Sequence, residues 1–186
     1  MKTLLKTLYP ALVLFAIFSI LCGVLYTGAV TGIARLLFPR QANGSIISVT
    51  SADGARRDYG SALIAQEFSK PEYLIGRPLG TTNLSPTSTA EKELVQERIL
   101  KWHALDSSNT AAIPLDLVTA SGSGVDPHIS PAAAEYQAGR IARARGISES
   151  VVRSAIRSHT KGRFLGIFGE PAVNVLEVNL TLDGLL

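Results

Sequence analysis

The hydropathy pattern begins with an uninterrupted apolar run near the N-terminus. Residues 7–34 contain no charged side chain, and their apolar density peaks in the stretch ALVLFAIFSILCGVLY. A helix needs about 20 apolar residues to cross the hydrocarbon core of a bilayer. The run therefore predicts one transmembrane helix over residues 7–34, preceded by a short flank of residues 1–6. A cleaved signal peptide is the alternative, but its apolar region covers only about 7–15 residues.

Small residues recur at a spacing of four within this predicted helix. One pair is Ser19 and Gly23, and a second pair is Gly28 and Gly32. Small residues at this spacing let another helix approach closely, although glycine is in any case common in membrane helices. A lone anchor has little need of such pairs, so the pattern predicts a face that docks against another membrane helix.

The pattern changes at residues 35–44, which we interpret as a turn-like linker. Residues 45–60 then predict a short strand, a turn at Asp53-Gly54 and a return strand. Residues 60–88 are rich in glycine, proline, serine and threonine, but apolar segments remain between them. We therefore expect irregular structure that packs on a core, with at most one short strand.

The clearest helix of the soluble part covers residues 88–107. Ser88 and Glu91 at its start have the spacing of a capping box. Apolar residues then recur at helical spacing along one face, namely Leu94, Val95, Ile99, Trp102 and Leu105. This face predicts a helix that packs against the core of the domain.

Two further helices are predicted by their ends. Ser130 suits an N-cap and Pro131 suits the first helical position, and Gly146 ends the same helix shortly after Arg145. A third helix is expected to begin after Ser148 and to end near His159.

Two apolar segments predict strands. Residues 114–120, PLDLVTA, are typical of a short buried strand. Residues 173–182, VNVLEVNLTL, alternate between apolar and polar positions, which favours a half-buried strand. The elements together predict one N-terminal transmembrane helix followed by a single α+β soluble domain, residues 45–186.

Composition narrows the classes of partner. Charged residues make up 18% of the chain, below the roughly 25% of ordinary soluble proteins. Lys2 and Lys6 account for two of the 18 basic residues, so the rest of the chain carries 16 basic and 15 acidic residues. A nucleic-acid-binding protein normally has a basic face, and we expect no nucleic-acid partner. The short basic run that contains Arg140, Arg143 and Arg145 is interpreted as a solvated face.

The charges that flank the apolar run give a weak indication of orientation. Lys2, Lys6 and the α-amino group precede the run, while Arg35 and Arg40 follow it. The positive-inside rule counts such residues, and the balance leans slightly toward a cytoplasmic N-terminus. The lone cysteine, Cys22, excludes both an internal disulfide and a cysteine zinc site.

One stretch combines the residue types of a ligand-binding loop. Residues 116–130 read DLVTASGSGVDPHIS and lead into the helix predicted to start at Ser130. The candidate residues for a nucleotide contact or a subunit contact are Asp116, Thr119, Ser121, Gly122, Ser123, Gly124, Asp126 and His128. Glycines permit tight turns, and hydroxyl groups bind nearby backbone groups or a ligand.

Neither a phosphate-binding loop nor a hydrolase site matches this stretch closely. A P-loop places a lysine after its glycines, whereas no lysine or arginine stands between Gly124 and Arg140. The N-terminus of a helix could still hold an anion, although Asp126 would repel it. A nucleophile elbow reads G-x-S-x-G, whereas this loop reads S-G-S-G. A triad of His128 with one of the loop serines stays open, because such triads depend on geometry.

Metal binding is not expected, and a structural role for the loop is the simplest interpretation. His103, His128 and His159 do not have the spacing of metal ligands. The glycines and hydroxyls of residues 116–130 suit a rigid connection between a strand and a helix. We therefore predict no metal ligand in this chain and expect a structural role for the loop.

Several blocks resemble one protein family, in the same order along nearly the whole chain. The blocks are GSALIAQEF at 60–68, YLIGRP at 73–78, NLSPTS at 83–88, PLDLVTASGSGVDPHIS at 114–130, YQAGRIARARG at 136–146 and HTKGRFLGIFGEPAVNVLEVNL at 159–180. With the apolar helix in front of them, they resemble the KdpC family, the C subunit of the bacterial Kdp potassium-transporting P-type ATPase. The family usually has glycine in place of Ala65 and Ser85, which are minor departures.

The resemblance implies a subunit of an ATP-driven potassium import complex in the bacterial inner membrane. Its partners would be a channel-like subunit that selects potassium and a P-type subunit that hydrolyses ATP, with the lipid bilayer around the anchor. The Asp-Lys-Thr-Gly motif of a P-type ATPase is missing, since Leu117, Val118 and Thr119 follow Asp116. The resemblance therefore implies an accessory subunit that has no catalysis and no cofactor of its own.

The family carries two accounts of mechanism. One describes the C subunit as a catalytic chaperone that raises the ATP affinity of the hydrolysing subunit, and likens the Ser-Gly loop to a nucleotide-contacting signature. The other places the soluble domain in the periplasm, over the entrance to the ion pathway, where ATP is absent. We expect the second arrangement, with the N-terminus in the cytoplasm and a role in assembly and in capping the ion entrance. Direct ATP contact through residues 121–124 is the alternative, and a membrane-anchored hydrolase that uses His128 is a further one.

Overall fold

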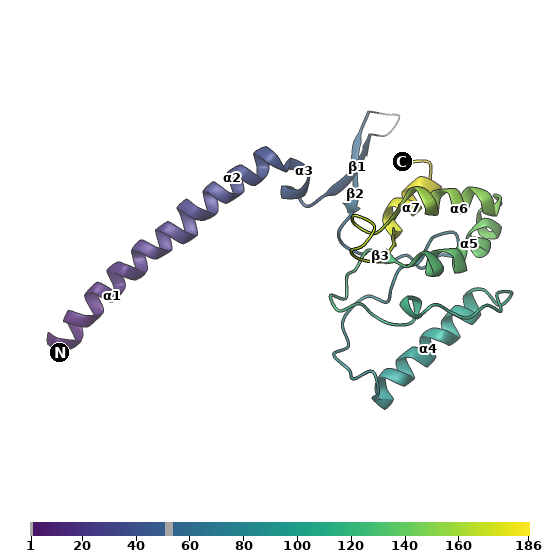
Figure 1. The fold of residues 1–186 in the computed structure, drawn as a ribbon, viewed down its shortest axis with the longest axis horizontal. Coiled ribbons are helices and arrows are strands. Elements are labelled where there is room, and N and C mark those ends of the chain that lie inside the picture. The colour runs from purple at the N-terminus through teal and green to yellow at the C-terminus, as the bar shows by residue number, and fades with distance from the viewer. Residues whose placement is uncertain (1, 51–53) are drawn as a thin grey trace. The chain divides into compact units, whose positions relative to one another are not determined.

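The computed structural model describes residues 2–50 and 54–186, and the chain divides into two compact units that meet between Ile46 and Ile47 (Figure 1). In the first unit, α1 (Lys2–Ile20), a π-helical segment η1 (Leu21–Tyr26) and α2 (Thr27–Leu37) follow one another without a break. The stretch Lys6–Leu37 is long and apolar enough to cross a membrane. This confirms the predicted class of fold, a single membrane helix ahead of a mixed domain.

The segment expected to be a turn-like linker at residues 35–44 is partly helical. α2 continues to Leu37, and a short helix α3 (Pro39–Ala42) follows after a break at Phe38. Phe38 has φ −134° and ψ 56°, because a residue before proline is disfavoured in the helical region. Proline itself suits the first position of a helix, so the chain resumes helical structure immediately.

Two small sheets form the strand part of the soluble unit. β1 (Ile46–Thr50) and β2 (Arg56–Ser61) pair in one sheet, as the pattern of residues 45–60 predicted. Of the expected turn, Gly54 has φ +78°, and Asp53 lies outside the described residues. The second sheet has the order β3 (His128–Ile129), β5 (Ala172–Asn174) and β4 (Thr160–Lys161), with antiparallel pairs.

The three predicted soluble helices are confirmed. They are α4 (Thr89–Leu105), α5 (Pro131–Arg145) and α6 (Glu149–Ser158). The hydroxyl oxygens of Ser88 and Ser130 accept hydrogen bonds from the backbone N–H groups of Glu91 and Ala133, so both residues are N-caps. Gly146 ends α5 in the left-handed conformation, with φ +66°.

The strand predicted for residues 114–120 is wrong. The chain forms a single 3₁₀ turn, η2 (Leu115–Leu117), in which Leu117 and Val118 are buried. The indole N–H of Trp102 donates to the Leu117 carbonyl over 2.9 Å, and Arg98 donates to the Val118 carbonyl over the same distance. Buried carbonyls need a partner, and here side chains of α4 take the place of a neighbouring strand.

The strand predicted for residues 173–182 is also wrong over most of its length. Only its first two residues belong to β5, and the rest form the helix α7 (Val175–Leu182). The Asn174 side chain caps this helix by accepting from the backbone N–H of Glu177 over 3.1 Å. α7 is buried on more than one side, since Val175, Leu176 and Val178 are all in the core. Alternation therefore did not distinguish a strand from a helix.

Residues 62–88 contain no regular strand or helix, which confirms the expected irregular structure. Two buried amide side chains hold this segment at Leu74 and Ile75. Asn179 accepts from the Leu74 N–H over 2.7 Å and donates to the Leu74 carbonyl over 2.9 Å. Gln137 makes the equivalent pair with Ile75, at 2.9 Å for both bonds. Each amide thus imitates the edge of a neighbouring β-strand.

Of the three arginines in the basic run of α5, only Arg143 is exposed as the composition indicated. Arg140 is only 4% exposed; its guanidinium donates to the carbonyls of Pro71 and Tyr73 and to the Gln137 side chain. Burial lowers the pKa of Arg140 to about 10. Its neighbour Arg143 donates both bonds of a bidentate pair to Asp106. These arginines therefore fasten the irregular segment and the end of α4 to α5.

Candidate functional site

The candidate loop is closed at its base by a short hydrogen bond. Asp116 lies in η2, at the start of the loop, and Ser130 is the N-cap of α5, at its end. The backbone N–H of Ser130 donates to Oδ2 of Asp116 over 2.6 Å. Because Ser130 also caps α5 through its hydroxyl group, the loop closure and the start of the helix share one residue.

The charge of Asp116 is held by this contact. Burial acts to raise the pKa of Asp116, but hydrogen bonds from Ser130 and the positive charge of Arg77 outweigh it. The pKa of Asp116 is therefore lowered, and the carboxylate stays ionised at neutral pH. Hydrogen bonds to a charged acceptor are stronger than those to a neutral one, so an ionised Asp116 fixes the loop firmly.

The loop hydroxyls bind the loop itself. Oγ of Ser123 accepts from the Val125 N–H over 3.3 Å, and Oγ of Ser121 accepts from the Asp126 N–H over 3.4 Å. The two serine oxygens lie 3.3 Å apart and share a further hydrogen bond. The Gly124 N–H donates to the Ser121 carbonyl over 3.1 Å. The backbone N–H groups of Gly124, Val125 and Asp126 are thus already used inside the loop.

Gly124 brings the loop against the irregular segment. Its φ is +70°, and a Cβ atom at this position would lie 2.7 Å from the carbonyl carbon of Gly80. The Gly80 N–H donates to the Gly124 carbonyl over 2.9 Å, and the Ala65 N–H donates to the Val125 carbonyl over 2.8 Å. By contrast, Gly122 has nothing within 4 Å of a hypothetical Cβ. Packing therefore requires a glycine at position 124, whereas position 122 has room for a side chain.

The structure does not assemble a hydrolase triad around His128. The backbone N–H of His128 donates to Oδ1 of Asp126 over 3.0 Å, and its ring Nδ1 lies 3.4 Å from the same oxygen. Within residues 116–130, all of which are described, no hydrogen bond joins His128 to Ser121 or Ser123. Asp126 and His128 thus form a local turn, and the serines bind elsewhere.

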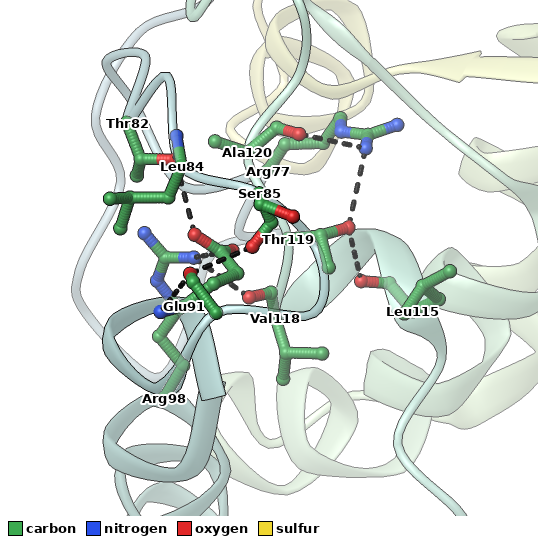
Figure 2. Close-up of polar contacts among 11 residues, drawn as sticks. Arg77, Thr82, Leu84, Ser85, Glu91, Arg98, Leu115, Val118, Thr119 and Ala120 are labelled. Atoms are coloured by element: carbon green, nitrogen blue, oxygen red, sulfur yellow. Dashed lines mark hydrogen bonds and ion pairs between the residues drawn. The ribbon is translucent and has the colours of Figure 1, made fainter. Parts of the chain in front are cut away.

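Arg77 is the residue that sequence reasoning missed at this loop. It comes from the YLIGRP block, and its Nη2 donates to Oγ1 of Thr119 over 3.4 Å and to the Ala120 carbonyl over 3.3 Å (Figure 2). Thr119 in turn donates to the Leu115 carbonyl over 2.8 Å. The Nε atom of Arg77 is buried, and no hydrogen-bond partner lies among the described residues. The fold thus supplies the cation that residues 125–139 lack.

A cavity of about 780 Å³ adjoins the loop. Its wall is formed by residues 81–84 and Pro86, by four residues of α4 that include Lys92, and by Leu115 and residues 119–122. Figure 2 shows Glu91 at the centre of this region, where its carboxylate accepts from the Thr82 hydroxyl over 3.1 Å and lies 4.0 Å from Arg98. Glu91 therefore bonds to neighbouring side chains, and only the Ser88 half of the expected capping box forms.

The four small residues of the membrane helix are all exposed. Ser19 lies in α1, Gly23 in the π-helical segment, and Gly28 and Gly32 in α2, and a Cβ at any of the three glycines would meet nothing within 4 Å. The π segment changes how the two pairs are placed around the helix. Gly23 and Gly28 are five residues apart, which corresponds to about 140° around an α-helix. In a π-helix, residues five apart lie closer to one face. The hydroxyl group of Thr27 donates to the Cys22 carbonyl, five residues earlier, over 2.8 Å.

His159 has a local role. The ring of His159 lies 2.6 Å from the Thr181 hydroxyl and 3.3 Å from the Glu177 carboxylate, so it joins the end of α6 to α7. Among the residues that the structure describes, no group of three His, Cys, Asp or Glu side chains could hold a metal ion.

Comparison with known proteins adds the family. The family model described as "KdpC: K+-transporting ATPase, c chain" matches residues 8–184. A potassium-transporting ATPase KdpC subunit of Listeria monocytogenes serotype 4a is 54% identical, over 100% of this chain and 99% of the relative. Proteins with the same name from Sorangium cellulosum and Rhodopseudomonas palustris are 48% and 47% identical, each over 97% of this chain and 99% and 98% of the relative.

Proposed function

The chain belongs to the KdpC family of potassium-transporting ATPase c chains, and from this premise we propose that it is a non-catalytic accessory subunit. In this role it would assemble with a channel-like potassium-selecting subunit and with a P-type subunit that hydrolyses ATP. It would stabilise their complex and cap the ion entrance. Its presence would also raise the ATP affinity of the hydrolysing subunit, through the conformation of the complex.

One observation carries the non-catalytic part of the proposal. The Ser121 and Ser123 hydroxyls, the Gly124 N–H and the two backbone N–H groups that follow are all bound within the loop. A nucleophile needs a free hydroxyl beside a base, and a phosphate cradle needs free N–H groups. A loop whose hydroxyls and three successive N–H groups are bound internally is suited to hold a fixed shape against a partner protein.

The proposed placement puts the N-terminus in the cytoplasm and the domain in the periplasm of the bacterial inner membrane. The helix Lys6–Leu37 supplies one crossing, and the charges before it outweigh those after it only slightly. A periplasmic domain has no access to ATP, so the placement and the internal bonds of residues 121–126 support the same role.

Thiol labelling in intact cells tests this placement. Ser123 is exposed and Cys22 is the only natural cysteine, so a Ser123→Cys change in a Cys22→Ser background gives one reporter in the loop. We expect a membrane-impermeant maleimide to label it in intact cells to the same extent as in lysed cells. Labelling only after lysis would place the loop in the cytoplasm and contradict the proposal.

Direct ATP contact is the second candidate function, and a specific feature favours it. The cavity of about 780 Å³ beside the loop has a volume suited to a nucleotide, and Lys92 lines it together with Thr119 and Ser121. If this function is correct, a photoreactive ATP analogue should crosslink to residues 115–122 in the purified complex. Lys92→Gln should then reduce the crosslink, while Lys101→Gln, on the far end of the same helix, should leave it unchanged.

A further inference from the structure

The connection between β4 and β5 carries the most exposed apolar group of the soluble unit. Four large side chains of residues 163–169, named the 163–169 tip below, are 62–74% exposed: Phe164, Leu165, Ile167 and Phe168. Soluble surfaces rarely gather large apolar side chains in this way without a partner. In the first unit, the exposed apolar side chains belong to the predicted membrane helix. The 163–169 tip lies in the second unit, so its exposure needs another explanation.

The tip is rigid rather than a loose loop. The Phe164 N–H donates to the Phe168 carbonyl over 2.8 Å, and the Phe168 N–H donates to the Phe164 carbonyl over 3.0 Å. At its base Arg163 forms a bidentate ion pair with Glu170, at 2.9 and 2.7 Å. The backbone that carries the four side chains is therefore held in one arrangement, and little backbone entropy would be lost when a partner binds.

Leu165 is strained as well as exposed. The Ile167 N–H donates to the Phe164 carbonyl over 3.1 Å, so residues 164–167 form a β-turn, and both central residues have positive φ, +52° at Leu165 and +74° at Gly166. Turns of this kind favour asparagine or glycine at the first central position. Leucine there is unfavourable for the backbone, and at 74% exposure its side chain gains almost nothing from the domain itself.

From these observations we infer that the 163–169 tip is a docking plug that inserts into an apolar pocket of another protein subunit of the same membrane complex. This inference rests on the proposed function, because it assumes partner subunits. Backbone strain at an exposed residue is characteristic of functional positions. A contact with another protein would explain both the strain and the exposure of Leu165.

The bilayer is a poor occupant for this tip. In the hydrocarbon core every backbone polar group needs a partner, so irregular turns that face lipid do not occur there. A four-residue turn cannot pair all its N–H and carbonyl groups internally. A protein pocket can supply the missing donors and acceptors, and it also makes use of the fixed shape of the tip, which fluid lipid would not require.

A second copy of this chain is also a poor occupant. Four side chains of this size expose on the order of 400–500 Å², whereas a stable interface buries about 800 Å² on each partner. The tip alone is thus too small to hold two free molecules together. It is large enough to strengthen a complex when another contact already holds the partner nearby. The anchor helix would provide that other contact for a subunit in the same membrane.

Exchange of Leu165 tests the inference with little risk to the fold. Leu165→Asn places the residue favoured by the turn, so the thermal unfolding midpoint of the detergent-purified chain should stay the same or rise. The partner subunits, co-expressed and captured through a tag on this chain, should dissociate at least 10-fold faster from the variant than from the natural chain. Leu100→Gln, which changes another leucine that is 61% exposed, is the matched control and should behave like the natural chain.

Three results would overturn the inference. Equal dissociation rates for Leu165→Asn and the natural chain would show that the tip is not a contact. A lower unfolding midpoint would show a role inside the domain. A dye on Leu165→Cys, in a Cys22→Ser background, that is quenched by brominated lipids in vesicles containing this chain alone would assign the tip to the bilayer. If the natural chain captures no partner subunit at all, the proposed function fails instead, and the two failures are therefore distinguishable.

Discussion

Asp116 and Ser130 join the two ends of the Ser-Gly loop through a 2.6 Å hydrogen bond between a carboxylate and a backbone N–H. We expect Asp116→Ala to lower the free energy of unfolding by about 1–2 kcal/mol, the usual loss for a hydrogen bond to a charged group that is only partly buried. Asp116→Asn keeps an acceptor oxygen and should lose less. Thermal unfolding of the full chain in detergent at pH 7 measures both.

The same contact gives a dependence on pH. The pKa of Asp116 is lowered in the folded chain, so its contribution to stability is complete above the ordinary aspartate pKa of about 4. The contribution is lost as the pH falls below that value and through the lower folded pKa. The natural chain should therefore lose more stability between pH 5 and pH 2.5 than Asp116→Asn does. Glu93→Gln, on the exposed side of α4, serves as the control, and an acid response of Asp116→Asn equal to that of the natural chain would contradict the prediction.

Gly122 and Gly124 offer a matched pair of substitutions. Gly124→Ala would force a non-glycine residue to φ +70° and place a methyl group 2.7 Å from the Gly80 backbone. We expect a loss of about 2–4 kcal/mol in the free energy of unfolding. Gly122→Ala has open space and should change it by less than about 0.5 kcal/mol. Equal effects of the two changes would show that the close approach to Gly80 is unimportant.

Arg140 should be sensitive even to lysine. Its guanidinium serves two carbonyls and the Gln137 side chain at once, and a lysine ammonium cannot reproduce this planar set of bonds. Arg140→Lys should lower the free energy of unfolding by about 2–4 kcal/mol, because it leaves buried acceptors without donors. Arg157→Lys, at an exposed position of α6, is the control and should be nearly neutral.

The membrane helix gives a prediction about assembly. Gly28 and Gly32 leave open space on one face of α2, and a leucine at either position would prevent close approach of another helix. Gly28→Leu with Gly32→Leu should therefore reduce the amount of partner subunit captured with the chain by at least 10-fold. Val30→Leu, at a position between them, replaces one large residue with another and should leave the captured amount unchanged. Unaltered capture of the partner subunits by the double variant would show that this face is not a docking surface.

Features that depend on neighbouring residues were predictable from the sequence. Ser88 and Ser130 cap the helices they were expected to cap, and Gly146 ends α5 as predicted. N-caps and helix ends are decided within one turn of the chain, so the sequence contains the information in one place. The long apolar helix is the same kind of feature.

Features that depend on distant residues were not predictable. The segment at Leu74 and Ile75 is held by amides that stand 105 and 62 residues away, and no local pattern shows such a pairing. α7 was mistaken for a strand because burial on several sides removes the contrast between an apolar and a polar face. Arg77 and Arg140 were overlooked as internal residues because arginine is usually exposed.

At the candidate loop the predicted helix start at Ser130 is confirmed, but the residues that pack against the loop were not predicted. The sequence identified the Ser-Gly stretch and its helix start, while the approach of Gly80 and Arg77 emerges only from the fold. Residues 125–139 contain no lysine or arginine, but the fold brings Arg77 to the loop from outside this range. This is why ATP contact keeps a structural basis as the second candidate.

The amide pairs of Gln137 and Asn179 also have a consequence for biosynthesis. The segment around Leu74 leaves the ribosome long before the residue that holds it, since Asn179 is translated 105 residues later. Until α7 has been made, the backbone groups of Leu74 lack the side chain that binds them, and the non-local contacts that complete the domain form last. The domain should therefore be finished only after the final helix has emerged, when the anchor has already entered the membrane. A chain cut short before Asn179 would carry an unfinished domain on a finished anchor.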